Sequence, residues 1–361
     1  MRILILANFG LGLYKFRKEL LEELINNHEV YFSIPNDEYV ELIEDIGCKY
    51  IDNPFLFRRG TNPIQDLRLL YYYKRIIKQI NPSIVFTFTI KPNVYGGMAC
   101  ASLGIPYVAN ITGLGTAVEK RGILQLVTLL LYKHGLRKAQ KVFFQNYENQ
   151  TFMLKHKVVS GAYDLIPGSG VNLNQYNALP YPNSGSVNFV FVARIMKEKG
   201  IEQYLDAAQA LKPKYPTSYF HICGFCEQDY ESVIHKLEAE GIIIYHGMVS
   251  DMIPIYINSS CIVHPSYYPE GLSNVLLEGA ASARPLITTN RSGCKEVVDD
   301  GVNGYLIKEK DSQDLINKLE LFINSDWETR KKMGLAGRVK VEREFDRSFV
   351  VNKYLSEISS I

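Results

Sequence analysis

Short apolar runs alternate along the chain with longer amphipathic stretches, and this alternation restricts the fold more than any other feature. The runs have the length of buried strands, and the stretches between them have the periodicity of helices that cover a sheet. Because a helix returns the chain to the edge where the next strand begins, such strands run parallel. We therefore predict an α/β chain with doubly wound parallel sheets. The segments are 3–7, 15–26, 29–34, 38–46, 84–89, 93–103, 107–110, 124–137 and 141–145, then 187–192, 201–212, 219–223, 229–240, 242–245, 261–264, 274–283 and 285–289, with closing helices from 311.

The alternation pauses over residues 166–186, where proline, glycine and asparagine are concentrated. A chain of 361 residues is also too long for one typical core. We predict two Rossmann-like domains that face each other across a cleft, one over 1–170 and one over 171–345. Residues 346–361 are expected to form a C-terminal helix that could return to the N-terminal domain.

The overall charge argues against a nucleic-acid partner. The chain has 40 lysines and arginines against 38 aspartates and glutamates, a formal net charge of +2. Non-specific nucleic-acid binding requires a much stronger positive field. The sequence begins with a strand-like segment rather than a secretion signal, and no segment is long and apolar enough to span a bilayer. The six cysteines are expected to be reduced thiols, as is usual in the cytoplasm. We therefore predict a cytoplasmic protein.

The basic residues are concentrated in the first half: residues 1–170 contain 20 lysines and arginines but only 14 aspartates and glutamates. Basic residues beside aromatic ones suit an anionic membrane surface or a phosphate-bearing acceptor. An ordinary solvated face with the aromatics in the core explains them equally well. The apolar stretch 123–132 could enter a bilayer interface, but as a crossover helix it is expected to be buried on one side, and we favour a place in the core. The residues concerned are Lys15, Arg17, Lys18, Arg58, Arg59, Lys74, Arg75, Lys78, Lys133, Arg137 and Lys138, with Phe55, Phe57, Tyr71, Tyr72 and Tyr73.

A candidate phosphate site lies where a strand ending near His264 gives way to a loop and then a helix. Ser273 or Asn274 could cap this helix with a side-chain oxygen. The other amides of its first turn, aided by the helix dipole, would then bind phosphate beside the carboxyl ends of the strands. Glu278, about one turn further along, could accept two hydrogen bonds from a ribose diol.

Two cations, Arg194 and Lys199, flank a second loop between a strand and a helix. Their side chains could converge on one anionic group and neutralise a diphosphate. That charge would remove the need for a divalent metal, and the sequence has no Asp-x-Asp pair to hold one. We therefore expect no metal and no cofactor.

Two further patterns are weak. Cys223 and Cys226 have the spacing of a zinc or redox pair, but no second Cys or His pair supports them. Gly10 and Gly12 lack the third glycine and the acidic residue of a dinucleotide site, which disfavours a nicotinamide cofactor.

Taken together, these motifs resemble glycosyltransferase family 4, whose members are retaining enzymes with the GT-B fold. Arg194 with Lys199-Gly200 and, some seventy residues later, Glu270-Gly271 and Glu278 carry the resemblance. Further matches are Gly224 to Glu227, Pro265-Ser266, Arg284-Pro285, 287–289, 293–298 and 301–304.

In the first half, residues 89–96 and 110–115 resemble the branch of the family that builds bacterial capsule, O-antigen and lipopolysaccharide or other lipid-linked oligosaccharides. This resemblance implies a UDP-sugar donor, bound by the C-terminal domain, and an acceptor on undecaprenyl diphosphate, bound by the N-terminal domain. It also implies a peripheral position on the cytoplasmic face of the membrane.

The resemblance implies roles for individual residues. Arg194 and Lys199 would bind the donor diphosphate, Glu278 the ribose, and Glu270 would lie near the sugar. Many members have a His before a Gly after the fourth strand, where this chain has Thr112, so no side chain is assigned as a catalytic base. The remaining implied donor contacts are Gly10 and Gly12, in a loop after the first strand, and Gly271, Leu272, Ser273, Asn274 and Val275; the implied acceptor or sugar contacts are Lys91, Asn93, Thr112 and Gly113.

The predicted function is metal-independent transfer of a sugar, an N-acetylhexosamine or a hexose, with retention of anomeric configuration. In this family the departing phosphate is generally considered to take the acceptor proton, which suits a site rich in phosphate-binding groups. Two alternatives stay open. One is a UDP-sugar 2-epimerase on the same fold, for which no pair of acid and base residues is identifiable. The other is a non-catalytic protein that binds nucleotide sugars.

Overall fold

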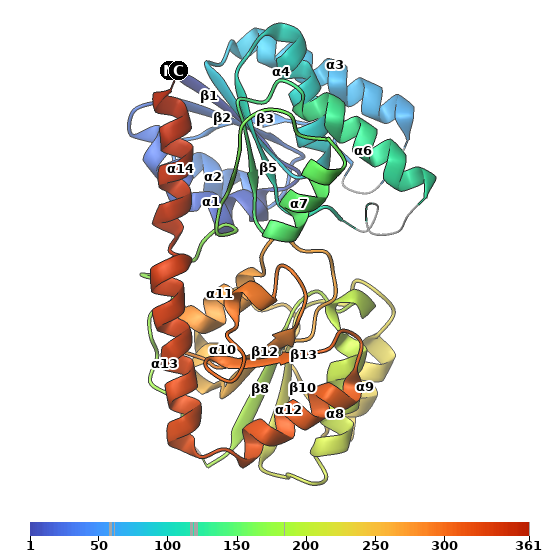
Figure 1. The fold of residues 1–361 in the computed structure, drawn as a ribbon, viewed down its shortest axis with the longest axis vertical. Helices are drawn as coiled ribbons and strands as arrows, with labels where there is room; N and C mark the ends of the chain where they lie inside the picture. The colour runs from blue at the N-terminus through green and yellow to red at the C-terminus, as the bar shows by residue number, and fades with distance from the viewer. Residues whose placement is uncertain (58–59, 61, 116–117, 119–121, 184, 361) are drawn as a thin grey trace. The chain divides into compact units, whose positions relative to one another are not determined.

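A computed structural model describes residues 1–57, 60, 62–115, 118, 122–183 and 185–360. Arg58 and Arg59 of the basic set, and Ile361, lie outside the described residues. The chain forms two compact units (Figure 1). The first contains Met1–Gly170, Pro269–Leu272 and the C-terminal segment from Arg347, and the second contains Val171–Tyr268 and Ser273–Asp346. The first unit therefore includes a short loop from the middle of the second half of the sequence.

The first unit is built on a seven-stranded parallel sheet with the order β3-β2-β1-β4-β5-β6-β7. Both faces of this sheet are buried, so its central strands are apolar at nearly every position. The strands are β1 (Arg2–Leu6), β2 (Glu29–Ile34), β3 (Lys49–Asp52), β4 (Ile84–Phe88), β5 (Tyr107–Ile111), β6 (Lys141–Phe144) and β7 (Tyr163–Leu165).

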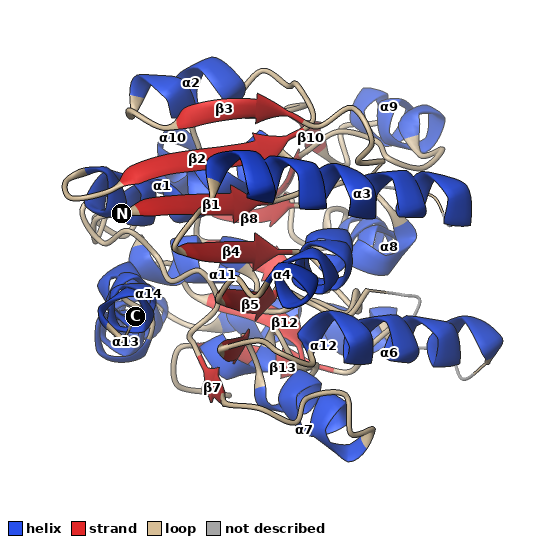
Figure 2. Cartoon of the chain, turned by 90° about the horizontal axis from the view of Figure 1, so that it is seen from above, coloured by secondary structure: helices blue, strands red, loops and turns tan. Residues whose placement is uncertain are grey.

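Helices cover the two faces of this sheet (Figure 2). Alternate residues of β1 point to opposite faces: Ile3 and Ile5 pack with α1, α2 and α14, whereas Leu4 and Leu6 pack with α3 and α4. The helices are α1 (Gly10–Ile25), α2 (Val40–Asp45), α3 (Pro63–Ile80), the π-helical turn η1 (Pro92–Gly96), α4 (Gly97–Leu103), α6 (Ile123–Leu136), α7 (Tyr147–Lys155) and α14 (Arg347–Ser359).

The C-terminal helix α14 completes the core of the first unit. Tyr354 is fully buried, with its ring 5.0 Å from that of Phe86 and 5.1 Å from that of Phe143. Its hydroxyl accepts a hydrogen bond of 2.6 Å from the side-chain amide of Asn110. At the start of the helix, Arg347 forms an ion pair of 2.7 Å with Glu19 of α1.

The second unit is built on a six-stranded parallel sheet with the order β10-β9-β8-β11-β12-β13. Its fully buried side chains include Phe189, Phe191 and Ile222. Its strands are β8 (Val187–Val192), β9 (Ser218–Cys223), β10 (Ile244–Tyr245), β11 (Cys261–His264), β12 (Leu286–Thr289) and β13 (Gly304–Ile307). Its helices are η2 (Lys197–Lys199), α8 (Ile201–Leu211), α9 (Glu231–Ala239), α10 (Ile253–Asn258), α11 (Asn274–Ala281), η3 (Lys295–Val297), α12 (Ser312–Asn324) and α13 (Trp327–Glu344).

In both sheets the strand order reverses at one point, between β1 and β4 and between β8 and β11. Ligands of open α/β sheets bind outside the carboxyl ends of the strands at such a point. In the second unit, the loop after β8 carries Arg194 and Lys199, and the loop after β11 leads to Glu270.

The predictions differ from the structure at helices α3, α6 and α7 of the first unit, and α7 was not among the predicted segments. The periodic segments did not include α3, which begins at the Asn62 cap and Pro63 and ends at Asn81 in the left-handed conformation. The crossover helix α6 has the expected buried side, which includes Leu129, Tyr132 and Leu136, but Ile123, Leu126 and Leu130 are 56–81% exposed. None of the helices that the structure describes combines the length and hydropathy required to span a lipid bilayer.

Candidate functional site

Arg194 and Lys199 converge on one aromatic ring in the second unit. The Arg194 guanidinium carbon lies 5.6 Å from the centroid of the Tyr268 ring, and the Lys199 ammonium nitrogen lies 5.1 Å from it. Lys199 is 8% exposed, and Tyr268 and Arg194 are half-buried. The two cations are therefore held close together beside the carboxyl ends of β8 and β11. This arrangement can bind an anion with two negative charges.

A close backbone contact fixes this arrangement. Gly200 has a φ of +77°, and a Cβ atom there would lie 2.2 Å from the carbonyl oxygen of Pro265. Only glycine permits both this conformation and this approach. The turn that carries Lys199 therefore packs directly on the loop that carries Tyr268.

Glu227 orients Arg194. Its carboxylate forms an ion pair with the guanidinium, and its backbone amide donates to the carbonyl of Ile195 at 3.0 Å. The sequence motif included Glu227, but its role was missed because Glu227 lies 33 residues from Arg194 along the chain. A carboxylate held in this way limits the rotamers available to the guanidinium.

Helix α11 begins as predicted at Ser273, but without the predicted side-chain cap. Ser273 is the N-cap residue, and its hydroxyl accepts no hydrogen bond from the first turn. Its backbone amide donates instead to the carbonyl of Gly293 at 2.7 Å. Asn274 and Val275, the first residues of the helix, are half-buried. The start of the helix is thus fixed by a backbone contact with the loop after β12.

The carboxylate of Glu278 accepts a hydrogen bond of 3.3 Å from the hydroxyl of Tyr256. Tyr256 is fully buried, and burial together with the neighbouring Glu278 raises its pKa well above 10, so the hydroxyl remains a donor. Buried Arg284 donates to the backbone carbonyl of Tyr256 at 2.7 Å. The sequence analysis gave Tyr256 no role, since no motif connects α10 with α11.

Glu270 and Gly271 belong to a loop that packs on the first unit. The side-chain amide of Asn146 donates to the carbonyls of Glu270 at 3.1 Å and Gly271 at 2.5 Å. The side-chain amide of Asn149 also donates to the Glu270 carbonyl, at 3.3 Å. Leu272 is buried against Gly168. No sequence motif indicates Asn146 and Asn149, because they lie more than 100 residues from this loop.

Thr112 and Gly113, implied contacts of the sugar or acceptor, lie against the same loop. A Cβ atom on Gly271 would lie 2.5 Å from the carbonyl oxygen of Thr112, and one on Gly113 would lie 3.0 Å from that of Pro269. Gly113 has a φ of +141°, which favours glycine. The structure therefore brings Thr112 and Gly113 together with Glu270 and Gly271.

Gly10 and Gly12 do not form the predicted loop. They lie in the first turn of α1, which begins at Gly10. The Gly10 amide donates to the carboxylate of Asp37 at 2.6 Å, and Asp37 also accepts from the amide of Tyr39. The carboxylate of Asp37 therefore occupies the helix start where a phosphate was expected, and it compensates the helix dipole.

Lys91 and Asn93, the remaining implied acceptor or sugar contacts, both have polar partners within the first unit. Asn93 is fully buried; its amide donates to the carbonyl of Asn110 at 2.8 Å, and its oxygen accepts from Thr87 at 2.7 Å. Such a side chain supports the sheet and cannot reach a ligand. Lys91 forms a 2.8 Å ion pair with Asp66 of α3, and both side chains are largely buried.

The four residues expected to contact the donor sugar, its diphosphate and its ribose are divided between the units: Arg194, Lys199 and Glu278 belong to the second and Glu270 to the first. Among the described residues, no group of three or more His, Cys, Asp or Glu side chains could hold a metal ion.

Known proteins with similar sequences are bacterial glycosyltransferases. The chain is 25% identical to a Campylobacter jejuni N,N'-diacetylbacillosaminyl-diphospho-undecaprenol alpha-1,3-N-acetylgalactosaminyltransferase, over 98% of this chain and 97% of the relative. It is 24% identical to an Escherichia coli UDP-Gal:alpha-D-GlcNAc-diphosphoundecaprenol alpha-1,3-galactosyltransferase, over 72% of this chain and 71% of the relative.

Solved structures share the fold across the whole chain. Anabaena HepE in complex with UDP-glucose aligns with a TM-score of 0.81 at 19% identity, over 100% of both chains. Family models match both halves of the sequence: "Glycosyl transferase 4-like" matches residues 2–146, and "Glycosyl transferases group 1" matches residues 182–340. The chain is thus a glycosyltransferase with the GT-B fold, whose first half is glycosyl transferase 4-like and whose second half matches the glycosyl transferases of group 1.

Proposed function

We propose that this glycosyltransferase moves an N-acetylhexosamine or a hexose from a UDP-sugar to a saccharide on undecaprenyl diphosphate, with retention of configuration and without a metal ion. It would act at the cytoplasmic face of the membrane during assembly of a bacterial surface glycan. The observation that carries the proposal is the convergence of Arg194 and Lys199 on the Tyr268 ring, where the strand order of the second sheet reverses.

The donor half of the proposal depends on charge and hydrogen bonding. The two cations would neutralise the diphosphate, and the amides at the start of α11 would add further donors. Glu278, oriented by Tyr256, would accept hydrogen bonds from the ribose hydroxyls. Structures of Anabaena HepE with UDP and with UDP-glucose support a UDP-sugar as the donor.

The proposed reaction needs no side chain as a base. The bond between the anomeric carbon and the phosphate oxygen breaks, and UDP leaves with the bonding electrons. The acceptor hydroxyl forms the new bond on the same face of the sugar, and its proton passes to the departing phosphate oxygen. Arg194 and Lys199 would stabilise the negative charge on UDP as it develops. A divalent metal would have no separate task.

The acceptor half is supported by the named relatives. Both the Campylobacter jejuni and the Escherichia coli enzymes are named for acceptors that are saccharides linked to undecaprenol through a diphosphate. In this chain, Thr112 and Gly113 contact the loop that carries Glu270. We propose that this group of residues lies close to the sugar and the acceptor hydroxyl.

The test is a transfer assay with the purified full chain. The donors are UDP-GalNAc, UDP-GlcNAc, UDP-galactose and UDP-glucose, and the acceptors are undecaprenyl-diphosphate-linked mono- and disaccharides. We expect one donor to give a lipid-linked product whose new linkage has the donor's anomeric configuration by NMR. The rate should be unchanged by EDTA. Release of a free epimerised sugar would show an epimerase instead, and UDP binding without turnover of any donor would show a binding protein.

A further inference from the structure

Helix α6 exposes apolar side chains and buries polar ones over its first half. Ile123, Leu126 and Leu130 are 81%, 62% and 56% exposed, and their spacing places them on one face of the helix. On the opposite face, Gln125 and Thr128 are buried and bonded to the carbonyls of Val118 and Leu124. Over residues 123–128 this polarity is the reverse of that of an ordinary surface helix, whereas Leu129, Tyr132 and Leu136 are buried further along. The exposed side is therefore suited to a second apolar environment.

Helix α3 shows a similar exposed face. Ile64, Leu67 and Tyr71 are 65%, 51% and 62% exposed, and they follow one another at helical spacing. We call these three residues, together with Ile123, Leu124, Leu126, Val127 and Leu130 of α6, the docking face.

Both halves of the docking face lie at the same edge of the first unit. Each helix leads from the carboxyl end of one parallel strand to the amino end of the next, so its N-terminal half lies toward the carboxyl edge of the sheet. Figure 2 shows α3 and α6 extending beyond the arrowheads of β1 and β4. Thr112, expected near the acceptor, also follows the carboxyl end of a strand in this sheet.

The charges around the docking face are those that attract an anionic surface. No acidic residue occurs between Gly122 and Tyr147, and Lys133 in the second half of α6 and Arg137 and Lys138 directly after the helix are exposed. The second half of α3 exposes Arg75 and Lys78.

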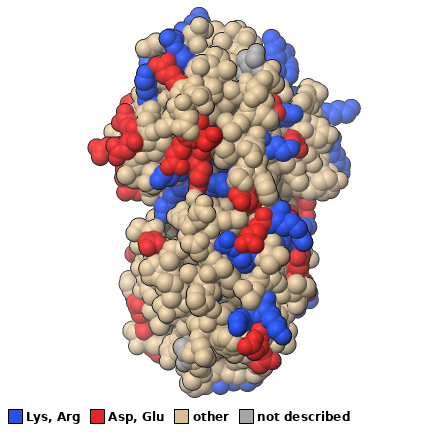
Figure 3. Space-filling model, turned by 90° about the vertical axis from the view of Figure 1, so that its left-hand side faces the viewer, with Lys and Arg blue, Asp and Glu red and all other residues tan. Residues whose placement is uncertain are grey.

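Two further charge features of the first unit concern Asp66 of α3 and the side that carries α14. Asp66 is neutralised by its ion pair with Lys91. The side that carries α14 differs, because acidic and basic side chains are interspersed there (Figure 3).

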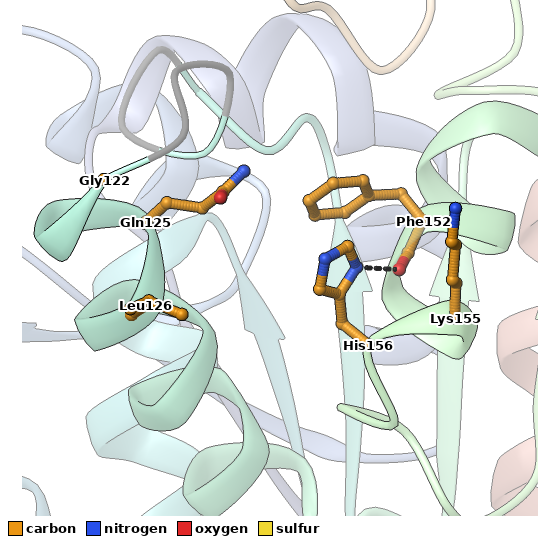
Figure 4. A pocket seen from close by; sticks show the side chains of 6 residues that line it. All are labelled: Gly122, Gln125, Leu126, Phe152, Lys155 and His156. Carbon is orange, nitrogen blue, oxygen red and sulfur yellow. Dashed lines mark hydrogen bonds between the residues drawn. The ribbon is translucent and has the colours of Figure 1, made fainter.

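A pocket of about 520 Å³ lies between α6 and α7, beside the docking face. Gln125, Leu126 and Phe152 line it together with Lys155 and His156 at the end of α7 (Figure 4). The His156 ring packs on that of Phe152, with centroids 4.3 Å apart. An apolar wall beside a cation suits the junction between a lipid chain and its phosphate.

We propose that the docking face inserts into the headgroup region of an anionic lipid bilayer, while the cations of α3 and α6 contact lipid phosphates. The inference rests on the proposed function, since an acceptor on a polyprenyl chain has to be taken from a membrane. Apolar side chains with cations behind them, no acidic side chain on α6, and Asp66 of α3 paired with Lys91 match the pattern of interfacial helices. At 14 residues, about 21 Å, α6 reaches the interface but does not span the bilayer.

The experiment measures co-sedimentation of the full chain with phosphatidylcholine vesicles that do or do not contain phosphatidylglycerol. The wild-type protein should bind the anionic vesicles and bind the neutral ones far less. The triple variant Ile123→Ser, Leu126→Ser, Leu130→Ser should lose at least about tenfold in affinity, because it removes three inserted side chains. Replacing Lys133, Arg137 and Lys138 by Gln should lose about fivefold for each cation in contact with the lipid.

A matched control replaces Leu321, Leu335 and Val339 of the second unit by Ser. These side chains are also exposed, and their replacement should leave vesicle binding unchanged. Equal binding by the wild-type chain and the α6 triple variant would overturn the proposal. So would a dimer in solution that the α6 triple variant dissociates, because the face would then join two copies of the chain.

The readout separates this proposal from the proposed function. Vesicle binding requires no sugar transfer, so a chain that binds anionic vesicles but transfers no sugar would refute only the proposed function. In the transfer assay, the α6 triple variant should be slower than the wild-type protein with an acceptor embedded in vesicles. The difference from the wild-type protein should be much smaller with a short-chain acceptor in solution.

Discussion

At the residue scale, the two cations on Tyr268 are expected to dominate catalysis. Arg194→Ala and Lys199→Ala should each lower kcat/KM by about 10²-fold or more, because each removes a charge from the departing diphosphate. The control is Lys197→Ala in the same turn. Lys197 is exposed, and its ammonium nitrogen lies 3.4 Å from a carboxylate oxygen of Glu202. Steady-state kinetics with the identified donor measure the effect. Equal activities for all three variants would contradict the assignment.

Glu278 gives a second prediction at this scale, which concerns only the ribose. Glu278→Gln should weaken UDP binding by about 10-fold to 100-fold, the loss expected for hydrogen bonds to a charged group. Tyr256→Phe should weaken UDP binding less, because it removes only the group that orients the carboxylate. Calorimetry with UDP and with inorganic diphosphate separates the contacts: neither variant should change diphosphate affinity. A loss with both ligands would place Glu278 at the phosphates.

At the scale of the element, the start of α1 distinguishes a helix terminus from a phosphate loop. A Cβ atom on Gly10 would lie 2.4 Å from an Asp37 carboxylate oxygen, whereas one on Gly12 would meet only the Phe9 ring at 3.4 Å. Gly10→Ala should therefore destabilise the fold by about 1–3 kcal/mol in urea denaturation. Gly12→Ala should not destabilise it and should leave the donor KM unchanged. If the Gly12→Ala protein were stable but no longer bound the donor, Gly12 would belong to the donor-binding loop that the family resemblance implied.

At the scale of the whole molecule, the first unit depends on the last helix of the chain. Tyr354→Ala removes a buried ring between Phe86 and Phe143 and should cost about 3–5 kcal/mol of unfolding free energy. Tyr354→Phe keeps the ring and loses only the hydrogen bond with Asn110, which should cost about 1 kcal/mol. Urea denaturation of the full chain measures both. A small effect of Tyr354→Ala would mean that the first unit is stable without α14.

The sequence alone was sufficient for the fold class, the order of most elements and the family, because these follow from local periodicity and from short motifs. It also identified Arg194 and Lys199 as a pair, since only four residues separate them and one turn carries both. The short strands β3 and β7 and the helix α3 were not among the predicted segments. The strands are too short to show a period, whereas α3 buries Leu69, Tyr72 and Ile76 at helical spacing, a signal that was present in the sequence and was missed.

Only the tertiary structure decided which distant residues meet. It showed that Glu270 and Gly271 pack against Asn146 and Thr112, that Asp37 occupies the start of α1, and that α6 exposes Leu126 and Leu130. The reason is physical: periodicity and motif spacing reflect interactions within one element. Contacts between residues 100 positions apart depend on how the elements pack. The sequence pattern of an apolar stripe is also the same whether the stripe faces a core or the solvent.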